Sequence, residues 1–324
     1  MSKGKSKQVP LPNPTAGSAN PAVSLSALWG YIEPALDHII RSQTNDPTQA
    51  PSIDVGYHMG IHTATYNYFT SQSENANHIT QYTLGDRTFT SVTSGADLYE
   101  QLDKYFVEAA RELFLGIPQD DSTLIHYIIP CFNRYSAGAH AANRLLNYVN
   151  RHYVKRAVDE DKGWLRFNDV LESVAKTITI DDTREKISKR FREKRGEELQ
   201  KWGYVDGASP DLLARAEACA EAASPPDRVV PVSSLALRRF RTEVIDPLLA
   251  TANPKGKTKV KNKINQPSKG RLSRAVKELM EATEGDEEER ARLATELAIA
   301  LRSVGVRADH PLRKRLDKFM TILA

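Results

Sequence analysis

Apolar residues recur at three- and four-residue steps through much of the chain, and this spacing places side chains on one face of a helix. Between residues 25 and 40 it predicts a core helix. We expect that helix to kink or restart near Pro34, because proline lacks the N–H that continues the helical ladder. The residues of its apolar face are Leu25, Leu28, Trp29, Ile32, Leu36, Ile39 and Ile40.

Another helix is predicted over residues 96–114. Asp97 can cap its start, with Glu100 three residues later as in a capping box. The segment before it, residues 73–96, is polar and rich in turn formers, so we expect a mobile loop there. The buried stripe of the helix is expected to consist of Leu98, Leu102, Tyr105, Ala109 and Leu113.

A long helical region is predicted over residues 122–158, interrupted or bent at Pro130 and eased at Gly138. Its stretch LLNYVNRHYVKR, residues 145–156, combines tyrosines, asparagines and a basic cluster. A segment with this mixture could bind a nucleic acid, or it could be a scaffold helix whose polar edge faces water. The apolar spacing favours the scaffold: the inward line is Ala142, Leu145, Leu146, Val149 and Tyr153, and the solvated residues are Arg144, Asn147, Arg151 and Lys155.

Further helices follow along the chain, and no alternating pattern is long enough to build a sheet. The chain is therefore predicted to be all-α, with stacked antiparallel helices joined by loops. The remaining predicted helices are 163–180, the charged 184–202, the alanine-rich 216–223, 233–249, 271–282, 287–306 and 310–323.

Two segments are too polar to form a core. Residues 1–22 are rich in Pro, Ser, Asn, Gly and Lys and are predicted to be a disordered arm. Residues 255–269 alternate lysine with small or polar residues and contain no acid, so self-repulsion favours a flexible linker.

The composition fits a globular protein with polar appendages. A chain of 324 residues with 40% hydrophobic content can bury a sizeable core, and its net charge of +4 reflects local basic clusters. Cys131 and Cys219 show neither disulfide nor zinc-ligand spacing, which favours a reducing compartment. No apolar run has the ~18 to 20 residues of a membrane span, and no secretory signal is seen. We expect a protein of the cytoplasm and nucleus.

Catalytic chemistry has no candidate in the sequence. His58 and His62 stand four residues apart, as two zinc ligands on one helix would, but the acid of HExxH and a third ligand are missing. A surface or interface role is favoured for both. The motifs GxGxxG, GxxxxGK[ST] and GxSxG are absent, so neither an enzyme nor a bound cofactor is expected, and no catalytic or metal-ligating residue is assigned.

Basic stretches leave a nucleic-acid-associated protein as the alternative. Two basic segments, residues 255–274 and 186–195, could attract phosphates through salt-sensitive electrostatic interactions. The first resembles a linker, however, and the second lies among Glu185, Glu193, Glu197 and Glu198. Neither nucleic acid nor a membrane is the expected partner.

Several segments in order resemble the N-terminal region of the cullin family. The most specific is YVNRHYVKR, residues 148–156, which is similar to the family pattern Y-L-N-R-H-W-V-x-R with Tyr153 in place of tryptophan. The pairing of MGIHTATYNYFTS with NRYSAGAHAANR resembles the class that scaffolds SCF ubiquitin ligases. The resemblance covers residues 24–180 and 233–250, and it resumes more weakly at 271–324.

The resemblance implies a rod of stacked five-helix cullin repeats. Residues 23–250 would be the first repeat, with a charged insertion at about 181–232. Residues 251–270 would be a basic linker, and 271–324 part of a second repeat.

The resemblance also implies a non-catalytic scaffold for ubiquitin-dependent protein degradation. The first repeat would bind a Skp-type adaptor carrying an F-box substrate receptor. In the family, the second and fifth helices of the first repeat contact the adaptor. By position these contacts fall on His58, Met59 and His62 for the repeat's second helix, and on Asn133, Ser136, Ala137 and His140 for its fifth helix. The family usually has tyrosines where this chain has His58 and His62, so adaptor binding is expected to respond to pH.

The sequence has no counterpart of the C-terminal cullin-homology region, which in the family recruits the RING subunit and carries the lysine that accepts the modifier Nedd. A RING partner and ligase competence are therefore not expected for this chain alone. It is interpreted as a fragment, a truncated gene product or a short competitor of full-length scaffolds.

Overall fold

The computed structural model describes residues 20–41, 49–82, 95–179, 182–250, 270–281 and 286–323. Every regular element in these ranges is helical, which confirms the all-α prediction. None of the described helices combines the length and the apolar content needed to cross a membrane. In chain order the elements are α1 (Leu25–Leu36), η1 (Asp37–Arg41), α2 (Val55–Tyr82), α3 (Ala96–Leu115), α4 (Leu124–Leu145), α5 (Asn147–Val149), η2 (Asn150–Val154), α6 (Lys155–Asp159), α7 (Phe167–Ala175), α8 (Arg184–Gln200), α9 (Pro210–Ala223), α10 (Val232–Phe240), η3 (Arg241–Ile245), α11 (Asp246–Leu249), α12 (Arg271–Glu281), α13 (Glu287–Ser303) and α14 (Pro311–Leu323), where η denotes a π-helical turn.

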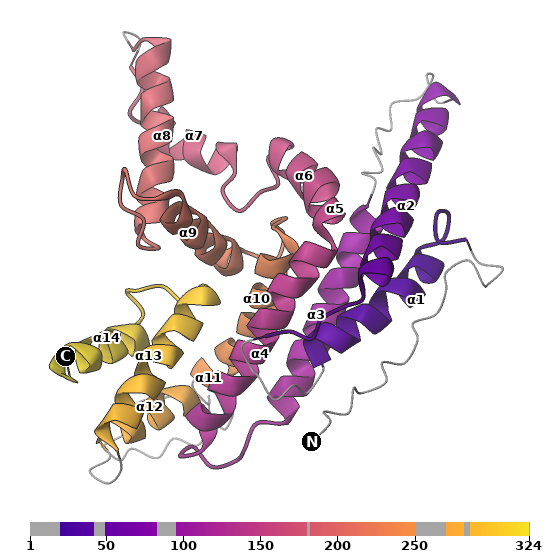
Figure 1. The fold of residues 1–324 in the computed structure, drawn as a ribbon. Coiled ribbons are helices and arrows are strands. Elements are labelled where there is room, and N and C mark those ends of the chain that lie inside the picture. The colour runs from indigo at the N-terminus through magenta and orange to yellow at the C-terminus, as the bar shows by residue number, and fades with distance from the viewer. Residues whose placement is uncertain are drawn as a thin grey trace, which may run out of the picture.

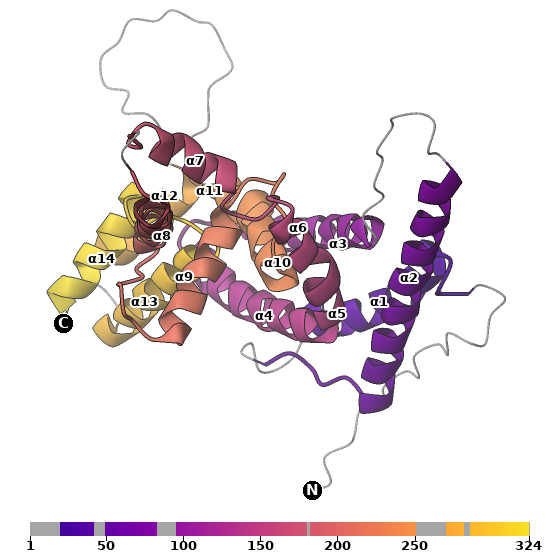
Figure 2. The same ribbon diagram turned by 90° about the horizontal axis from the view of Figure 1, so that it is seen from above.

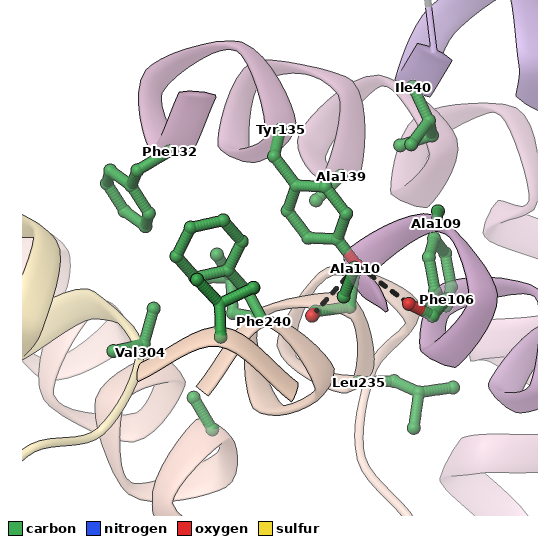
Figure 3. Packing of buried hydrophobic residues seen from close by; sticks show 14 of the residues in the cluster. Ile40, Phe106, Ala109, Ala110, Phe132, Tyr135, Ala139, Leu235, Phe240 and Val304 are labelled. Atoms are coloured by element: carbon green, nitrogen blue, oxygen red, sulfur yellow. Dashed lines mark hydrogen bonds between the residues drawn. The ribbon is translucent and has the colours of Figure 1, made fainter. Parts of the chain in front are cut away.

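The centre of the core lies where α3, α4 and α10 pack against one another (Figure 1). Phe240 of α10 places its ring 5.3 Å from that of Tyr135 and 5.5 Å from that of Phe132, both on α4. The Tyr135 hydroxyl donates toward the carbonyl oxygens of Ala236 at 3.2 Å and Phe106 at 3.5 Å (Figure 3). Because Tyr135 is buried, these carbonyls replace the water that its hydroxyl would otherwise bind.

The helices are arrayed along the molecule with α4 near the middle. α1 and α2 lie at one end and α12, α13 and α14 at the other (Figure 2). α4 packs against η1 on one side and against α12 and α13 on the other. Arg271, at the start of α12, lies 2.9 Å from the Asp121 carboxylate and donates to the Pro118 carbonyl at 2.7 Å, which joins α12 to the loop before α4.

α8 and α9 form a second, smaller hydrophobic cluster within the predicted insertion. The charged helix expected at 184–202 is present as α8, and most of its side chains are exposed. The alanine-rich helix expected at 216–223 begins earlier, because Ser209 caps it and Pro210 occupies its first turn. Arg302 of α13 donates to the Trp202 carbonyl at 2.8 Å and ties this cluster to α13. Its buried members are Leu199, Trp202, Ala216, Cys219 and Ala220.

Neither Pro34 nor Pro130 interrupts its helix. α1 continues through Pro34 to Leu36 and then widens into η1, and α4 continues through Pro130 to Leu145. The break falls instead at Leu146, whose φ of −100° and ψ of 29° are not helical. Proline removes a single N–H, and here the packing of buried neighbours keeps both helices intact around it.

Gly138 has a packing role in α4. A Cβ at this position would lie 2.6 Å from the Ile39 carbonyl oxygen and 2.9 Å from Cδ1 of Ile40. The backbone of η1 therefore rests directly on α4, an approach that only a residue without a Cβ permits.

The cap predicted at Asp97 is wrong, as is the loop predicted over residues 73–82. The N-cap position of α3 is Gly95, whose φ of 89° suits glycine. Asp97 lies inside the first turn, where its carboxylate accepts hydrogen bonds from the Tyr68 hydroxyl and, at 2.9 Å, from the Gln72 amide. These bonds hold the second half of α2, which continues to Tyr82.

The remaining predictions for irregular segments fall largely on residues that the structure does not describe. The arm predicted at 1–22 corresponds mostly to residues 1–19, the linker to 251–269 and the rest of the predicted loop to 83–94, all outside the described ranges. The domain boundaries drawn from these segments stay predictions.

Candidate protein-docking site

α2 buries one set of large side chains and presents another to solvent. Ile61 is fully buried, and Tyr68 and Phe69 are nearly so. On the opposite face Met59 is 59% exposed and Tyr66 is 49% exposed. Apolar side chains left in water along one helix face are typical of a surface that a partner covers, because burying them is favourable.

The ring of Tyr148, on α5, joins this face of α2 to the helical segment that follows α4. It lies 5.6 Å from the ring of His62, 5.7 Å from that of Tyr66 and 5.3 Å from that of Phe69, each in an edge-to-face arrangement. It also stacks on His152 of η2 at 4.0 Å. We call these five residues the ring cluster. Edge-to-face and stacked rings attract one another beyond their burial, so the cluster fixes α2 against α5.

The outward face of the cluster is continuous with the exposed side of α2. The exposed residues of this side follow one another at three- and four-residue steps, and Tyr148 and His152 extend the row from the neighbouring segment. We call this surface the docking ridge, which consists of Val55, His58, Met59, His62, Tyr66, Tyr148 and His152.

The break at Leu146 and the π-helical turn η2 set the direction of Tyr148. Within this segment Val149 and Tyr153 point into the core, and the Tyr153 ring packs on that of Tyr99 at 5.0 Å. The Tyr99 hydroxyl donates to the Val230 carbonyl at 2.8 Å. With Val149 and Tyr153 held inside, Tyr148 and His152 are left on the side that faces α2.

α2 is anchored at its first turns as well as at Asp97. The Tyr57 hydroxyl donates to the Tyr31 carbonyl of α1, and the rings of these two tyrosines lie 4.8 Å apart. A Cβ at Gly60 would overlap the Tyr31 hydroxyl, so glycine permits the close approach of α1 and α2. The docking ridge is therefore carried by a helix held at several points and does not depend on a loop.

Burial and neighbouring cations favour the neutral forms of polar groups on and near the ridge. Burial lowers the pKa of His152, and the nearby charges of Arg151 and Arg156 lower it further, as does His62. On α4, partial desolvation likewise lowers the pKa of His140, and Arg144 adds to the effect. Burial raises the pKa of the Tyr148 hydroxyl. Neutral imidazoles and a neutral phenol can pack against apolar side chains without the desolvation that a charged group would require.

The residues that the sequence assigned to the adaptor contact lie on two helices, α2 and α4, which contact each other. His58, Met59 and His62 are exposed together on α2, and His62 joins the ring cluster. On α4, His140 is exposed, whereas Asn133, Ser136 and Ala137 are half-buried. In the described part of the chain, no ring contact or side-chain hydrogen bond joins any of these four residues to α2.

Tyr66, Tyr148 and His152 of the docking ridge were not predicted from the sequence as contact residues. Tyr148 and His152 lie within YVNRHYVKR, which was identified as the most specific segment but interpreted only as a scaffold helix. Their four-residue spacing was the available signal, because it places an aromatic ring and an imidazole on one side of a helix. Among the residues whose placement is described, no group of three or more His, Cys, Asp or Glu side chains could hold a metal ion.

Comparison with known proteins gives one informative match. The chain is similar to cell division control protein 53 of Saccharomyces cerevisiae. The two are 26% identical over 144 residues, a region that covers 43% of this chain and 17% of the yeast protein. This similarity supports a cullin-like relationship. No model of a protein family matches the chain, and no solved structure matches it.

Proposed function

We propose that this chain is a non-catalytic, cullin-like scaffold module of ubiquitin-dependent protein degradation. In this proposal the docking ridge binds a Skp-type adaptor that carries an F-box substrate receptor. Met59 is the central anchor, and the ring cluster forms the rigid support beside it. The observation that carries the proposal is the exposure of Met59 and Tyr66 on a helix whose opposite face is buried.

The chemistry of the ridge supports a protein partner. Interfaces depend on a few aromatic, methionine and other large side chains that become desolvated, while the surrounding rim adds little energy. Methionine adapts its shape to the opposing surface, and the rings beside it lose little entropy on binding because the cluster already holds them.

The sequence comparison supports the cullin-like part of the proposal. The similarity to cell division control protein 53 spans 17% of that protein, so the adaptor, the F-box receptor and the site of action in cytoplasm and nucleus are proposals for this chain. The proposal assigns it no catalytic step and no RING partner.

The experiment is an adaptor pull-down with a matched control. The purified chain is immobilised and exposed to a purified Skp-type adaptor in complex with an F-box protein. Met59→Asp places a carboxylate at the centre of the ridge and is expected to weaken binding by at least ~30-fold, the effect of losing a hot-spot residue. Ile299→Asp on α13 is the control, because Ile299 is 58% exposed and Met59 is 59% exposed.

The outcomes separate clearly once circular dichroism and thermal melts show that both variants fold like the wild type. Loss of binding by Met59→Asp, with binding retained by Ile299→Asp, supports the proposal. Equal binding by all three proteins contradicts the assigned site. Failure of the wild-type chain to bind any adaptor contradicts the proposed function.

A further inference from the structure

The two segments that build the docking ridge contain no acidic residue. No Asp or Glu occurs from residue 55 through 73 or from 122 through 158, although the whole chain carries 41 acidic residues among 324. α4 is largely buried, which accounts for part of this absence, but the exposed positions of residues 55–73 and 147–158 also include no acid. The nearest acids along the chain lie at the edges of these segments: Asp54 before α2, Glu74 farther along α2, and Asp159 and Glu160 at the end of α6.

Four cations stand on the same segment as Tyr148 and His152. Arg144, Arg151, Lys155 and Arg156 are exposed, and no described carboxylate lies within salt-bridge distance of any of them. Elsewhere on the surface such pairs are common. Lys194 lies 2.8 Å from Glu197 on α8, for example.

The positions of the cations relative to the ridge give them a common role. Arg151 and Lys155 follow Tyr148 at three- and four-residue steps, which favours one side of the helical segment, and Arg144 lies in the last turn of α4, just before the break at Leu146. The cations thus form a rim beside the rings. Charges at the rim of an interface mainly speed the encounter and select the partner by its opposite charge.

The arrangement of the rings distinguishes a protein from a nucleic acid as the occupant. Bases bind a protein by stacking on open aromatic faces. Here His62, Tyr66 and Phe69 meet Tyr148 edge to face, and His152 occupies a face of Tyr148, so the cluster is closed upon itself. Met59 and Val55 extend the surface as an apolar patch, which suits side chains more than phosphates.

We propose that the partner bound by the docking ridge presents an acidic protein face, whose carboxylates pair with Arg151 and Lys155 while Arg144 and Arg156 extend the attraction at the rim. This inference rests on the proposed function and adds the chemistry of the partner. An uncompensated cationic rim repels itself in the free protein, and an acidic partner relieves that repulsion on binding.

The first experiment measures association kinetics with the purified adaptor and F-box complex at low and high salt. The double variant Arg151→Glu with Lys155→Glu is compared with Arg151→Gln with Lys155→Gln. The control is Lys314→Glu with Lys318→Glu on α14, two exposed lysines without a described carboxylate partner. We expect charge reversal to slow association by ~10-fold or more at low salt and neutralisation to slow it less. The control should match the wild type.

The result that overturns the inference differs from the result that overturns the proposed function. If Met59→Asp abolishes binding but charge reversal leaves the association rate and its salt dependence unchanged, the ridge binds an adaptor and the acidic-face inference is wrong. If the wild-type chain binds no adaptor, the proposed function is wrong and the inference is tested with a defined probe.

That probe is a fluorescent helical peptide with glutamates at four-residue spacing on one side and leucines on the other. A peptide with glutamine at each of those glutamate positions and a DNA duplex of equal charge are measured beside it. Binding of the glutamate peptide that is lost on charge reversal supports the inference. Absence of peptide binding, or tighter binding of the duplex, overturns it.

Discussion

Asn143 and Asn150 hydrogen-bond to each other across the break at Leu146, with Nδ2 of Asn150 2.9 Å from Oδ1 of Asn143. Their side-chain oxygens also accept the first backbone N–H groups of α10: Oδ1 of Asn150 from Val232 at 3.0 Å and Oδ1 of Asn143 from Ser233 at 3.1 Å. α10 follows Pro231, which cannot supply a side-chain cap. Two asparagines from another part of the chain therefore cap this helix.

Asn150→Ala should destabilise the fold, because it leaves a partly buried Val232 N–H without its acceptor and removes the link to Asn143. The expected loss is about 1 to 3 kcal/mol in the free energy of unfolding. Urea denaturation followed by circular dichroism measures it. Asn147→Ala, at an exposed asparagine of the same segment, is the control and should change stability little. Equal effects of the two variants would contradict the capping role.

Gly138→Ala and Gly196→Ala should change stability in opposite directions. At Gly138 the new Cβ would meet the Ile39 backbone, and the resulting displacement is expected to destabilise the protein by about 1 to 3 kcal/mol. At Gly196, inside α8, nothing lies within 4 Å of the new Cβ. Alanine there should stabilise by about 0.5 to 1 kcal/mol because it restricts the unfolded chain. Thermal melts of both variants test the pair.

Glu221 should make the stability of the protein depend on pH. Burial raises the pKa of its carboxyl to about 7, although the Ser234 hydroxyl donates to it at 2.6 Å and Arg238 acts in the opposite direction. The folded state therefore retains a proton that the unfolded state releases between about pH 4.5 and pH 7. Stability falls as pH rises through this window and then levels off.

Glu221→Gln removes this titration. The effect of the substitution on the free energy of unfolding, relative to the wild type, should therefore be more favourable at pH 8 than at pH 5. The expected relative gain is about 1 kcal/mol, because the side chain keeps partial access to solvent. Denaturation curves at several pH values measure it. Glu108→Gln, at an exposed residue of α3, is the control and should leave the pH profile of the wild type unchanged. A Glu221→Gln profile parallel to that of the wild type would exclude the role of this carboxyl.

Tyr148→Ala should weaken adaptor binding by at least ~10-fold, because Tyr148 connects the rings of α2 to η2 and its loss loosens the docking ridge. Tyr148→Phe should bind like the wild type, since no hydrogen bond to the Tyr148 hydroxyl is found among the described residues. Titration calorimetry with the adaptor complex distinguishes the two variants. Weak binding by both would assign the effect to the hydroxyl and contradict the packing argument.

Much of the fold could be predicted because helical periodicity is a local property. The inward positions of α1 were predicted from spacing alone, and Leu28, Ile32 and Leu36 are fully buried. The same holds for the line through Ala142, Leu145, Leu146, Val149 and Tyr153, all of which are buried. A stripe of apolar side chains must be covered by something, whatever its neighbour is.

Capping and helix breaks were predicted less well because they depend on distant residues. Asp97 matched the local pattern of a capping box, yet its carboxylate accepts hydrogen bonds from Tyr68 and Gln72 of α2. Pro130 suggested an interruption or a bend, yet α4 continues through it without interruption, and the break at Leu146 accompanies the asparagine pair that caps α10. A local sequence pattern does not reveal which distant residues will contact a given side chain.

The candidate site, too, could be predicted only in part from the sequence. The exposed positions of His58, Met59 and His62 followed from their resemblance to a known docking helix, but the ring cluster required the approach of α5 and η2 to α2.

The sequence by itself determined that this protein is helical, which faces of its helices are apolar and where its acids are missing, because these properties belong to short stretches of chain. The tertiary structure alone decided that Tyr148, stacked on His152, stands beside His62 and Tyr66 and that cations without a described carboxylate partner lie on the same segment. The reason is physical: contacts between residues far apart in the chain form only when the packing of the whole core brings their helices together.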